Sequence, residues 1–114
     1  MDIESELARK DALTGIRNRN AYEEELQKLT WRMQKDNIKF GFAVIDVNFL
    51  KLVNDTYGHE MGNITICKCC EIVCRIFAHS PVFRIGGDEF AGRVVFAGGF
   101  CAVQALGAGA EIED

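Results

Sequence analysis

The feature that most constrains the fold is residues 81–97 (PVFRIGGDEFAGRVVFA), where two short apolar runs are interrupted by glycines and acids. Gly86 and Gly87 supply turn chemistry, and each flanking run has the length of a strand, so this stretch predicts a β-hairpin. Asp88 and Glu89 follow the glycines directly. The hairpin is therefore both a structural element and a candidate site.

A second strand is predicted at residues 40–46 (FGFAVID), because this apolar run is short and has polar residues on both sides. The strand ends at Asp46. If it pairs beside the hairpin, Asp46 meets Asp88 and Glu89. Three carboxylates repel one another unless a divalent cation neutralises them, and hard oxygen ligands suit Mg²⁺ or Mn²⁺. An ordinary acidic turn is the alternative interpretation.

A helix is predicted to begin near residues 18–20, because apolar side chains recur from there at helical spacing. Four of them are expected to face the core: Tyr22, Leu26, Leu29 and Met33. Trp31 is expected to be partly buried.

Further along, Gly58 is expected to close a short helix, with a turn over residues 59–63 and a second helix over residues 64–78. Tyr57 and Phe77 are assigned to the core.

Four of the five cysteines lie within residues 67–74 (CKCCEIVC). Cys67, Cys70 and Cys74 share one helical face, since they stand at positions i, i+3 and i+7. A zinc site normally needs four ligands, whereas this stretch offers one C-x-x-C pair without a second pair downstream. The pattern therefore favours reduced core thiols over zinc.

The composition narrows the function. A chain of 114 residues that is 48% hydrophobic fits one domain, and its net charge of −4 argues against a general nucleic-acid or membrane-surface binder. No apolar run approaches the roughly 20 residues of a membrane span, and the first ten residues are too charged for a signal peptide. A cytoplasmic protein is expected.

Residues 84–90 (RIGGDEF) resemble the signature of the GGDEF domains, the diguanylate cyclases that join two GTP molecules into cyclic di-GMP. Residues 11–22 (DALTGIRNRNAY) and 42–63 (FAVIDVNFLKLVNDTYGHEMGN) resemble other motifs of that family, in the expected order. The resemblance implies an α/β (α+β) fold of the nucleotide-cyclase type with a ferredoxin-like palm. It assigns residues 11–96 to a partial GGDEF domain and leaves 97–114 as a Gly/Ala-rich tail outside the family pattern. Residues 1–10 are expected to form a helical connector, because acids, bases and a few apolar residues alternate there.

The resemblance also implies roles for the acids. Asp46 and the backbone carbonyl of Val47 would bind Mg²⁺ or Mn²⁺, and Glu89 would support the metal site. Asp88 would be the second carboxylate ligand and the base for the attacking 3′-hydroxyl of GTP, with Glu89 grouped with it as catalytic.

The substrate is expected to contact residues on both sides of Gly58, where the short helix is expected to end, and the two signature glycines. These residues are Phe49, Leu50, Lys51, Asn54, Asn63, Gly86 and Gly87. Asn54 and Asn63 would contact guanine, Phe49 to Lys51 would face the phosphates, and the glycines would let the backbone approach the nucleotide closely, with positive φ where the turn needs it. Each domain holds one GTP, so a homodimer is implied, with a sensory domain upstream.

The chain departs from the family pattern at several places. Asn48 and Asn63 stand where the family usually has Asp, and residues 77–80 (FAHS) lack the R-x-x-D of the product-inhibition site. After Phe90 the only basic residue is Arg93, so the phosphate grip and the C-terminal part of the sheet are expected to be missing, as in a truncation or a shifted reading frame. The chain alone is expected to be inactive; a degenerate GGDEF domain that binds GTP or dimerises is the alternative.

Overall fold

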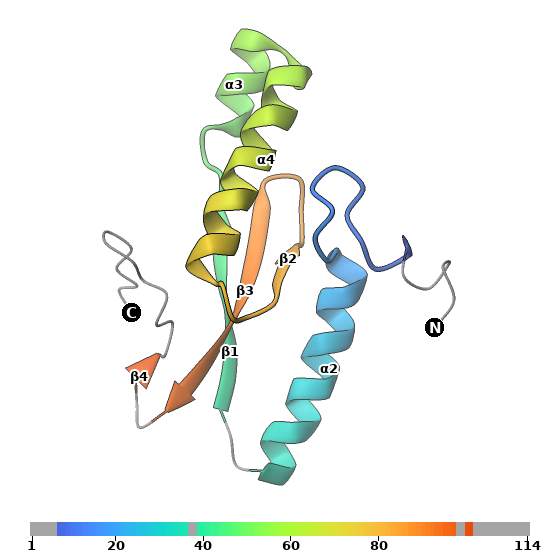
Figure 1. Cartoon of the computed structure of the whole chain (residues 1–114), viewed down its shortest axis with the longest axis vertical. Coiled ribbons are helices and arrows are strands. Elements are labelled where there is room, and N and C mark those ends of the chain that lie inside the picture. The colour runs from blue at the N-terminus through green and yellow to red at the C-terminus, as the bar shows by residue number, and fades with distance from the viewer. Residues whose placement is uncertain (1–6, 37–38, 98–99, 102–114) are drawn as a thin grey trace.

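The computed structural model describes residues 7–36, 39–97 and 100–101, and it has an α+β architecture (Figure 1). The elements run in the order α2 (Arg19–Asp36), β1 (Lys39–Asp46), α3 (Leu50–Tyr57), α4 (His59–Ile76), β2 (Val82–Arg84), β3 (Glu89–Ala97) and β4 (Phe100–Cys101). The mixed helix and sheet class is the one that the sequence predicts.

An antiparallel sheet organises the molecule. Strand β3 lies between β1 and β2, and the short β4 pairs with the end of β3. The predicted hairpin is therefore confirmed as β2 and β3. Strands β1 and β3 pair over their whole common length, from Lys39 opposite Phe96 to Asp46 opposite Glu89. This register brings the end of β1 beside the start of β3.

Helices α2 and α4 cover opposite faces of the sheet. From α2, Tyr22 packs edge-to-face on Phe42 and Phe83, with ring centroids 4.9 Å and 5.7 Å away. Successive strand residues point to opposite faces, so Ala43 and Ile45 turn toward the other layer, where α4 lies. The core of that layer contains Val47, Ile66, Cys70, Val73, Phe77, Val82, Phe90 and Val94.

Helix α2 begins where the sequence predicts, because the Asn18 side-chain oxygen accepts a hydrogen bond (3.1 Å) from the Ala21 amide as an N-cap. Leu29 is buried as expected. The core burial expected for Leu26 and Met33 is wrong, since they are 42% and 37% exposed, and Trp31, expected to be partly buried, is 60% exposed. Trp31 lies about 200° around the axis from Leu29, and the other two lie at the margins of a narrow buried stripe.

The predicted turn over residues 59–63 is also wrong, because α4 begins at His59. Gly58 alone separates α3 from α4, with a positive φ of 92° that favours glycine. Asn63 consequently lies in the first turns of a helix. Phe77 is in the core as predicted, whereas Tyr57 is 71% exposed, contrary to the prediction.

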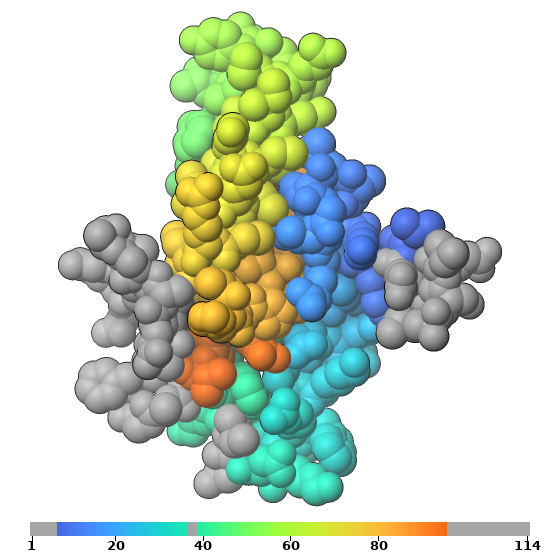
Figure 2. Space-filling view, viewed as in Figure 1, coloured from blue at the N-terminus to red at the C-terminus, as the bar shows by residue number. Residues whose placement is uncertain are grey.

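The cysteine face of α4 points into the molecule, as expected for core thiols. Cys70 is buried, and its sulfur lies 3.9 Å from that of the half-buried Cys74. The Cys67 thiol is 3.8 Å from the carbonyl oxygen of Leu13. Leu13 belongs to residues 11–17, here called the N-terminal loop, which Figure 2 shows packed against α4.

The expected connector and tail lie mostly outside the described residues. Of residues 1–10 the structure describes 7–10, and of the tail it describes Ala97 and 100–101. Phe100 pairs with Ala97, so this part of the tail forms a strand, which its composition does not predict. Within the described ranges, no helix combines the length and the apolar character needed to cross a membrane.

Candidate functional site

Three carboxylates meet where β1 ends and β3 begins. Asp46 is the β-sheet partner of Glu89, and the Val47 amide donates a hydrogen bond (2.8 Å) to the carbonyl oxygen of Asp88. One carboxylate oxygen from each of Asp46, Asp88 and Glu89 lies within 4.8 Å of the other two. The antiparallel register thus gathers acids from two distant parts of the sequence.

The chemistry of this cluster fits a hard divalent cation. Asp46 and Asp88 are exposed and Glu89 is half-buried, so an ion has access from solvent. All the donors are oxygens, which suits Mg²⁺ or Mn²⁺, whose ligands stand about 2.0–2.1 Å from Mg²⁺. In the part of the chain that the structure describes, this is the one group of three potential metal-ligating side chains.

Two arginines fix the turn that carries the acids. Arg84 Nη2 donates a hydrogen bond (2.7 Å) to the carbonyl oxygen of Gly87, and its Nη1 contacts Asp11 at 3.1 Å. Arg19 Nη1 donates to the carbonyl oxygen of Ile85 at 3.1 Å. The hairpin turn is therefore tied both to the N-terminal loop and to the start of α2.

Asp11 is the anionic centre of the N-terminal loop. Its Oδ2 accepts hydrogen bonds from the Thr14 amide (2.8 Å) and from the Thr14 hydroxyl (2.7 Å). Burial raises the pKa of the Asp11 carboxyl, but the hydrogen bonds from Thr14 and the guanidinium of Arg84 outweigh it and hold the pKa below its ordinary value. Asp11 is thus a firm anchor for Arg84.

The signature glycines have different surroundings. A Cβ on Gly86 would stand 3.1 Å from Glu89 Oε1, whereas a Cβ on Gly87 would meet no described atom within 4 Å. The positive φ expected for the turn is not found there, because among the described glycines it occurs at Gly15 and Gly58. Open space beside Gly87, rather than a left-handed backbone, is what distinguishes this turn.

The predicted phosphate-facing segment lies directly after β1. Phe49 is the N-cap of α3 and is 52% exposed, and Lys51 is exposed in its first turn. Leu50 packs against the core, and its amide donates a hydrogen bond (3.2 Å) to the carbonyl oxygen of Val47, the predicted metal-binding carbonyl. The segment is therefore a tight link between the acid cluster and α3.

The two asparagines predicted to contact guanine lie at the junction of α3 and α4. Asn54 is half-buried in α3, and its side chain reaches over Gly62 of α4. Asn63, the next residue, is exposed. Figure 1 shows α3 and the first turns of α4 projecting beyond the end of the sheet where the β2–β3 turn lies.

Arg93 faces away from this site. Its Nη1 lies 3.1 Å from Glu25 Oε1 of α2, and its guanidinium stands over the Phe40 ring at 5.9 Å. The one basic residue that follows Phe90 in the sequence is consequently engaged in joining α2 to the sheet.

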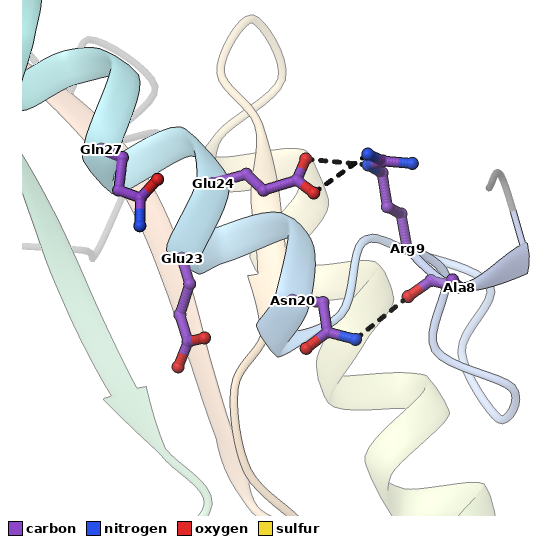
Figure 3. Close-up of a pocket in the computed structure, with 6 residues that line it drawn as sticks. All are labelled: Ala8, Arg9, Asn20, Glu23, Glu24 and Gln27. Carbon is purple, nitrogen blue, oxygen red and sulfur yellow. Dashed lines mark hydrogen bonds and ion pairs between the residues drawn. The ribbon is translucent and has the colours of Figure 1, made fainter. Parts of the chain in front are cut away.

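A separate pocket of about 410 Å³ lies between the N-terminal residues and α2 (Figure 3). In this pocket Arg9 contacts Glu24 through two hydrogen bonds of 2.8 Å and 3.0 Å, and Asn20 donates to the carbonyl oxygen of Ala8. The Arg9 hydrogen bond lowers the pKa of Glu24. The pocket contains none of the predicted site residues.

Sequence reasoning missed the residues that hold the hairpin turn in place. Arg19 and Asp11 belong to the quoted motif DALTGIRNRNAY, but no role follows from their spacing. Their partners, Ile85 and Arg84, are 66 and 73 positions away in the chain. The available signal was that this motif contains charged residues, Asp11 and Arg19, for which no function had been proposed.

Comparisons with known proteins agree on one family. The family model described as "Diguanylate cyclase, GGDEF domain" matches residues 8–95. The chain is 35% identical over 96 residues to the diguanylate cyclase DgcS of Shewanella oneidensis, which covers 80% of this chain and 32% of DgcS. It is 37% identical over 81 residues to the diguanylate cyclase DgcP of Escherichia coli, covering 70% of this chain and 24% of DgcP.

Solved structures give the same result. The coiled coil and GGDEF domain of DgcB from Caulobacter crescentus, in complex with c-di-GMP, superimposes with a TM-score of 0.76 at 29% identity. That match covers 81% of this chain and 49% of the DgcB chain. The diguanylate cyclase SiaD of Pseudomonas aeruginosa, in complex with its activator SiaC, gives a TM-score of 0.68 at 32% identity and covers 79% and 35%. The chain thus spans half or less of the length of these relatives.

Proposed function

This chain belongs to the GGDEF domain family of diguanylate cyclases, and we propose that it is a cyclase-type domain that binds GTP together with Mg²⁺. In the proposed reaction two such domains join two GTP molecules into cyclic di-GMP. The observation that carries the proposal is the meeting of Asp46, Asp88 and Glu89 beside the open space at Gly87. The domain is proposed to span residues 11–96, with 1–10 as a connector from an upstream sensory domain.

Asp46, Asp88 and Glu89, with the carbonyl of Val47, are the residues that would hold Mg²⁺ or Mn²⁺. When bound, the metal would neutralise charge on the phosphates and favour the ionised 3′-oxygen. Without a cation the same three carboxylates repel each other and any triphosphate. Substrate binding is therefore expected to depend on the divalent ion.

The remaining roles fall to groups of the chain itself. Asp88 accepts the proton of the 3′-hydroxyl, and that oxygen forms a bond to the α-phosphorus of the other GTP. The bond to the leaving pyrophosphate breaks, so two GTP give one cyclic di-GMP and two pyrophosphates. Gly86 and Gly87 leave the turn open to the nucleotide, Lys51 attracts the phosphates, and the backbone around Phe49 and Leu50 faces them.

Guanine recognition is assigned to Asn54 and Asn63. An Asn54 amide offers both a donor and an acceptor to the guanine edge. Asn63 offers one acceptor oxygen where the family has a carboxylate, and a lost charge-assisted hydrogen bond costs about 1.5–3 kcal/mol. Weaker guanine binding than in the family is the expected consequence.

Two domains must face each other, because each one holds a single GTP and the product contains two guanylates. We therefore include a homodimer in the proposal. A cytoplasmic location, where GTP is available, belongs to the same proposal.

A non-catalytic GGDEF module that binds GTP or dimerises is the second candidate. Asn63 favours it, and so does Arg93, whose pairing with Glu25 leaves it unable to grip a phosphate near the acids. The two candidates share the binding site and differ in turnover.

Calorimetric titration with GTP, with and without Mg²⁺, tests the proposal on the wild-type chain and on Asp46→Ala. Asp55→Ala is the matched control, because Asp55 is also an exposed acid but lies in α3, outside the cluster. We expect Mg²⁺-dependent binding that Asp46→Ala loses and Asp55→Ala keeps. Chromatographic detection of cyclic di-GMP would then establish turnover and rule out the non-catalytic module, whereas its absence is the result expected of this chain alone. Absence of GTP binding in the wild type would overturn the cyclase and the GTP-binding module, and would leave the family assignment and a module that only dimerises.

A further inference from the structure

Gly62 lies buried near the start of α4, directly beneath the side chain of Asn54 from α3. A Cβ placed on Gly62 would stand 2.8 Å from Asn54 Cγ and 3.4 Å from Nδ2, and closer still to Oδ1. Carbon and oxygen atoms that are not bonded do not approach so closely. An alanine at position 62 and the present orientation of the Asn54 amide are therefore mutually exclusive.

The backbone gives no other reason for a glycine at this position. Positive φ occurs at Gly15 and Gly58 among the glycines that the structure describes, so Gly62 has an ordinary helical conformation. Within a helix, glycine is less favourable than alanine. The missing Cβ is consequently explained by the Asn54 side chain that occupies its space.

We propose that Gly62 is a positioning residue for nucleobase recognition: by leaving its Cβ position empty, it sets the orientation of the Asn54 amide. The inference rests on the proposed function, in which Asn54 contacts guanine. It adds a residue of α4 that determines specificity without touching the nucleotide. The Gly62→Ala variant should fold, because the short side chain of Asn54 can rotate away, but its amide then points elsewhere.

The test compares Gly62→Ala with Thr65→Ala, a matched substitution in the same helix. Thr65 donates its hydroxyl to the carbonyl oxygen of Met61 at 2.9 Å, and its replacement also introduces an alanine into α4. In ¹⁵N-resolved NMR spectra, the side-chain amide signals of Asn54 should shift in Gly62→Ala and stay in place in Thr65→Ala. GTP affinity should fall by about tenfold in Gly62→Ala alone, the loss expected for about one good hydrogen bond. The preference for GTP over ATP should fall with it, whereas Mn²⁺ affinity at the acid cluster should stay unchanged.

A second measurement separates failure of the inference from failure of the proposed function. In an Asn54→Ala background the clash is absent, so Gly62→Ala should raise the midpoint of thermal unfolding through its better helix propensity. In the wild-type background the rise should be smaller or reversed. If the wild type binds no GTP, the proposed function fails. This double-mutant cycle still decides whether Gly62 determines the orientation of the Asn54 amide. Equal midpoint shifts in both backgrounds, or unmoved Asn54 signals in Gly62→Ala, would overturn the inference.

Discussion

Arg84 Nη1 lies 3.2 Å from Oδ1 and 3.1 Å from Oδ2 of Asp11, and this ion pair joins the signature hairpin to the N-terminal loop. The two side chains are only 16% and 19% exposed, so solvent screens the pair weakly. Because Arg84 also holds the carbonyl of Gly87, one guanidinium connects the first described loop with the turn that carries the acids.

Replacing Arg84 should therefore weaken both the fold and the site. Arg84→Ala leaves the partly buried Asp11 carboxylate without its cation and frees the Gly87 carbonyl, and we expect a loss of about 2 kcal/mol in the free energy of unfolding. Urea denaturation measures it. Arg84→Lys keeps the charge without the forked geometry and should recover only part of the loss. An unchanged unfolding midpoint in Arg84→Ala would show that the pair contributes no stability.

The pH dependence of stability should carry the signature of Asp11. Its pKa is lowered in the folded protein, so the ion pair contributes fully above the unfolded value of about 3.9 and is lost as pH falls through the lower folded value. Below about pH 4 the wild type should therefore lose stability more steeply than Asp11→Asn. Thermal unfolding of both proteins across this range makes the comparison. Parallel curves would mean that Asp11 has the same pKa in the folded and unfolded states.

The two strands that carry the acids could be predicted from the sequence because local rules fix them, whereas the meeting of the acids is expected only if the strands pair. A hairpin with a two-glycine turn and an apolar strand ending in Asp46 leave few ways to pair, and the antiparallel register then sets Asp46 opposite Glu89. Tight turns and strand ends are local features, so one sequence is enough to place them.

The errors have equally physical causes. Apolar periodicity shows which residues share a helix face, but not how wide a stripe the sheet will cover, and Leu26 and Met33 fall at its margins. Gly58, Gly62 and Asn63 together have the composition of a turn, yet a single positive φ at Gly58 makes the break and α4 starts at once. Pairings such as Arg84 with Asp11 depend on three-dimensional proximity, which one sequence does not encode locally.

Neutralising one acid of the cluster should have opposite effects with and without metal. In metal-free protein Asp46→Asn removes like-charge repulsion and should raise stability slightly, by about 0.5 kcal/mol or less for exposed groups. With Mn²⁺ at about a hundredfold excess over Kd, the wild type should gain about 2.7 kcal/mol by mass action, and the variant should gain almost none.

Thermal unfolding with Mn²⁺ and with a chelator measures both effects, and Asp55→Asn serves as the control acid outside the cluster. Equal stabilisation of Asp46→Asn and wild type by Mn²⁺ would place the metal elsewhere.

Cys70 should resist alkylation in the folded protein. Burial, followed by the neighbouring Cys74, raises the pKa of the Cys70 thiol to about 12, so at pH 8 only about one molecule in ten thousand carries the reactive thiolate. Iodoacetamide labelling followed by peptide mass spectrometry should leave Cys70 unmodified, whereas the same treatment in guanidinium chloride labels it fully. Rapid labelling of Cys70 in the native protein would contradict its place in the core.

At Gly92, the ring of Phe77, the C-cap residue of α4, packs directly against the backbone of β3. A Cβ at this position would lie 2.5 to 2.7 Å from three ring carbons of Phe77, which is itself 5% exposed and has no room to withdraw. Strand β3 is paired on both sides at this point, to Ala43 of β1 and to Val82 of β2, so its backbone cannot shift either. Gly92→Ala should therefore cost about 2 kcal/mol through overpacking.

The matched test of this clash is a double-mutant cycle with Phe77→Leu, which replaces the ring by a smaller side chain. Phe77→Leu alone should destabilise by leaving a cavity, but in its presence Gly92→Ala should cost less than about 1 kcal/mol, because the alanine methyl group fills part of that space. Denaturant unfolding of the four proteins gives the coupling between the two positions. Strictly additive costs would show that the methyl group introduced by Gly92→Ala does not meet the Phe77 ring, and the loss in Gly92→Ala would then have to come from the strand itself.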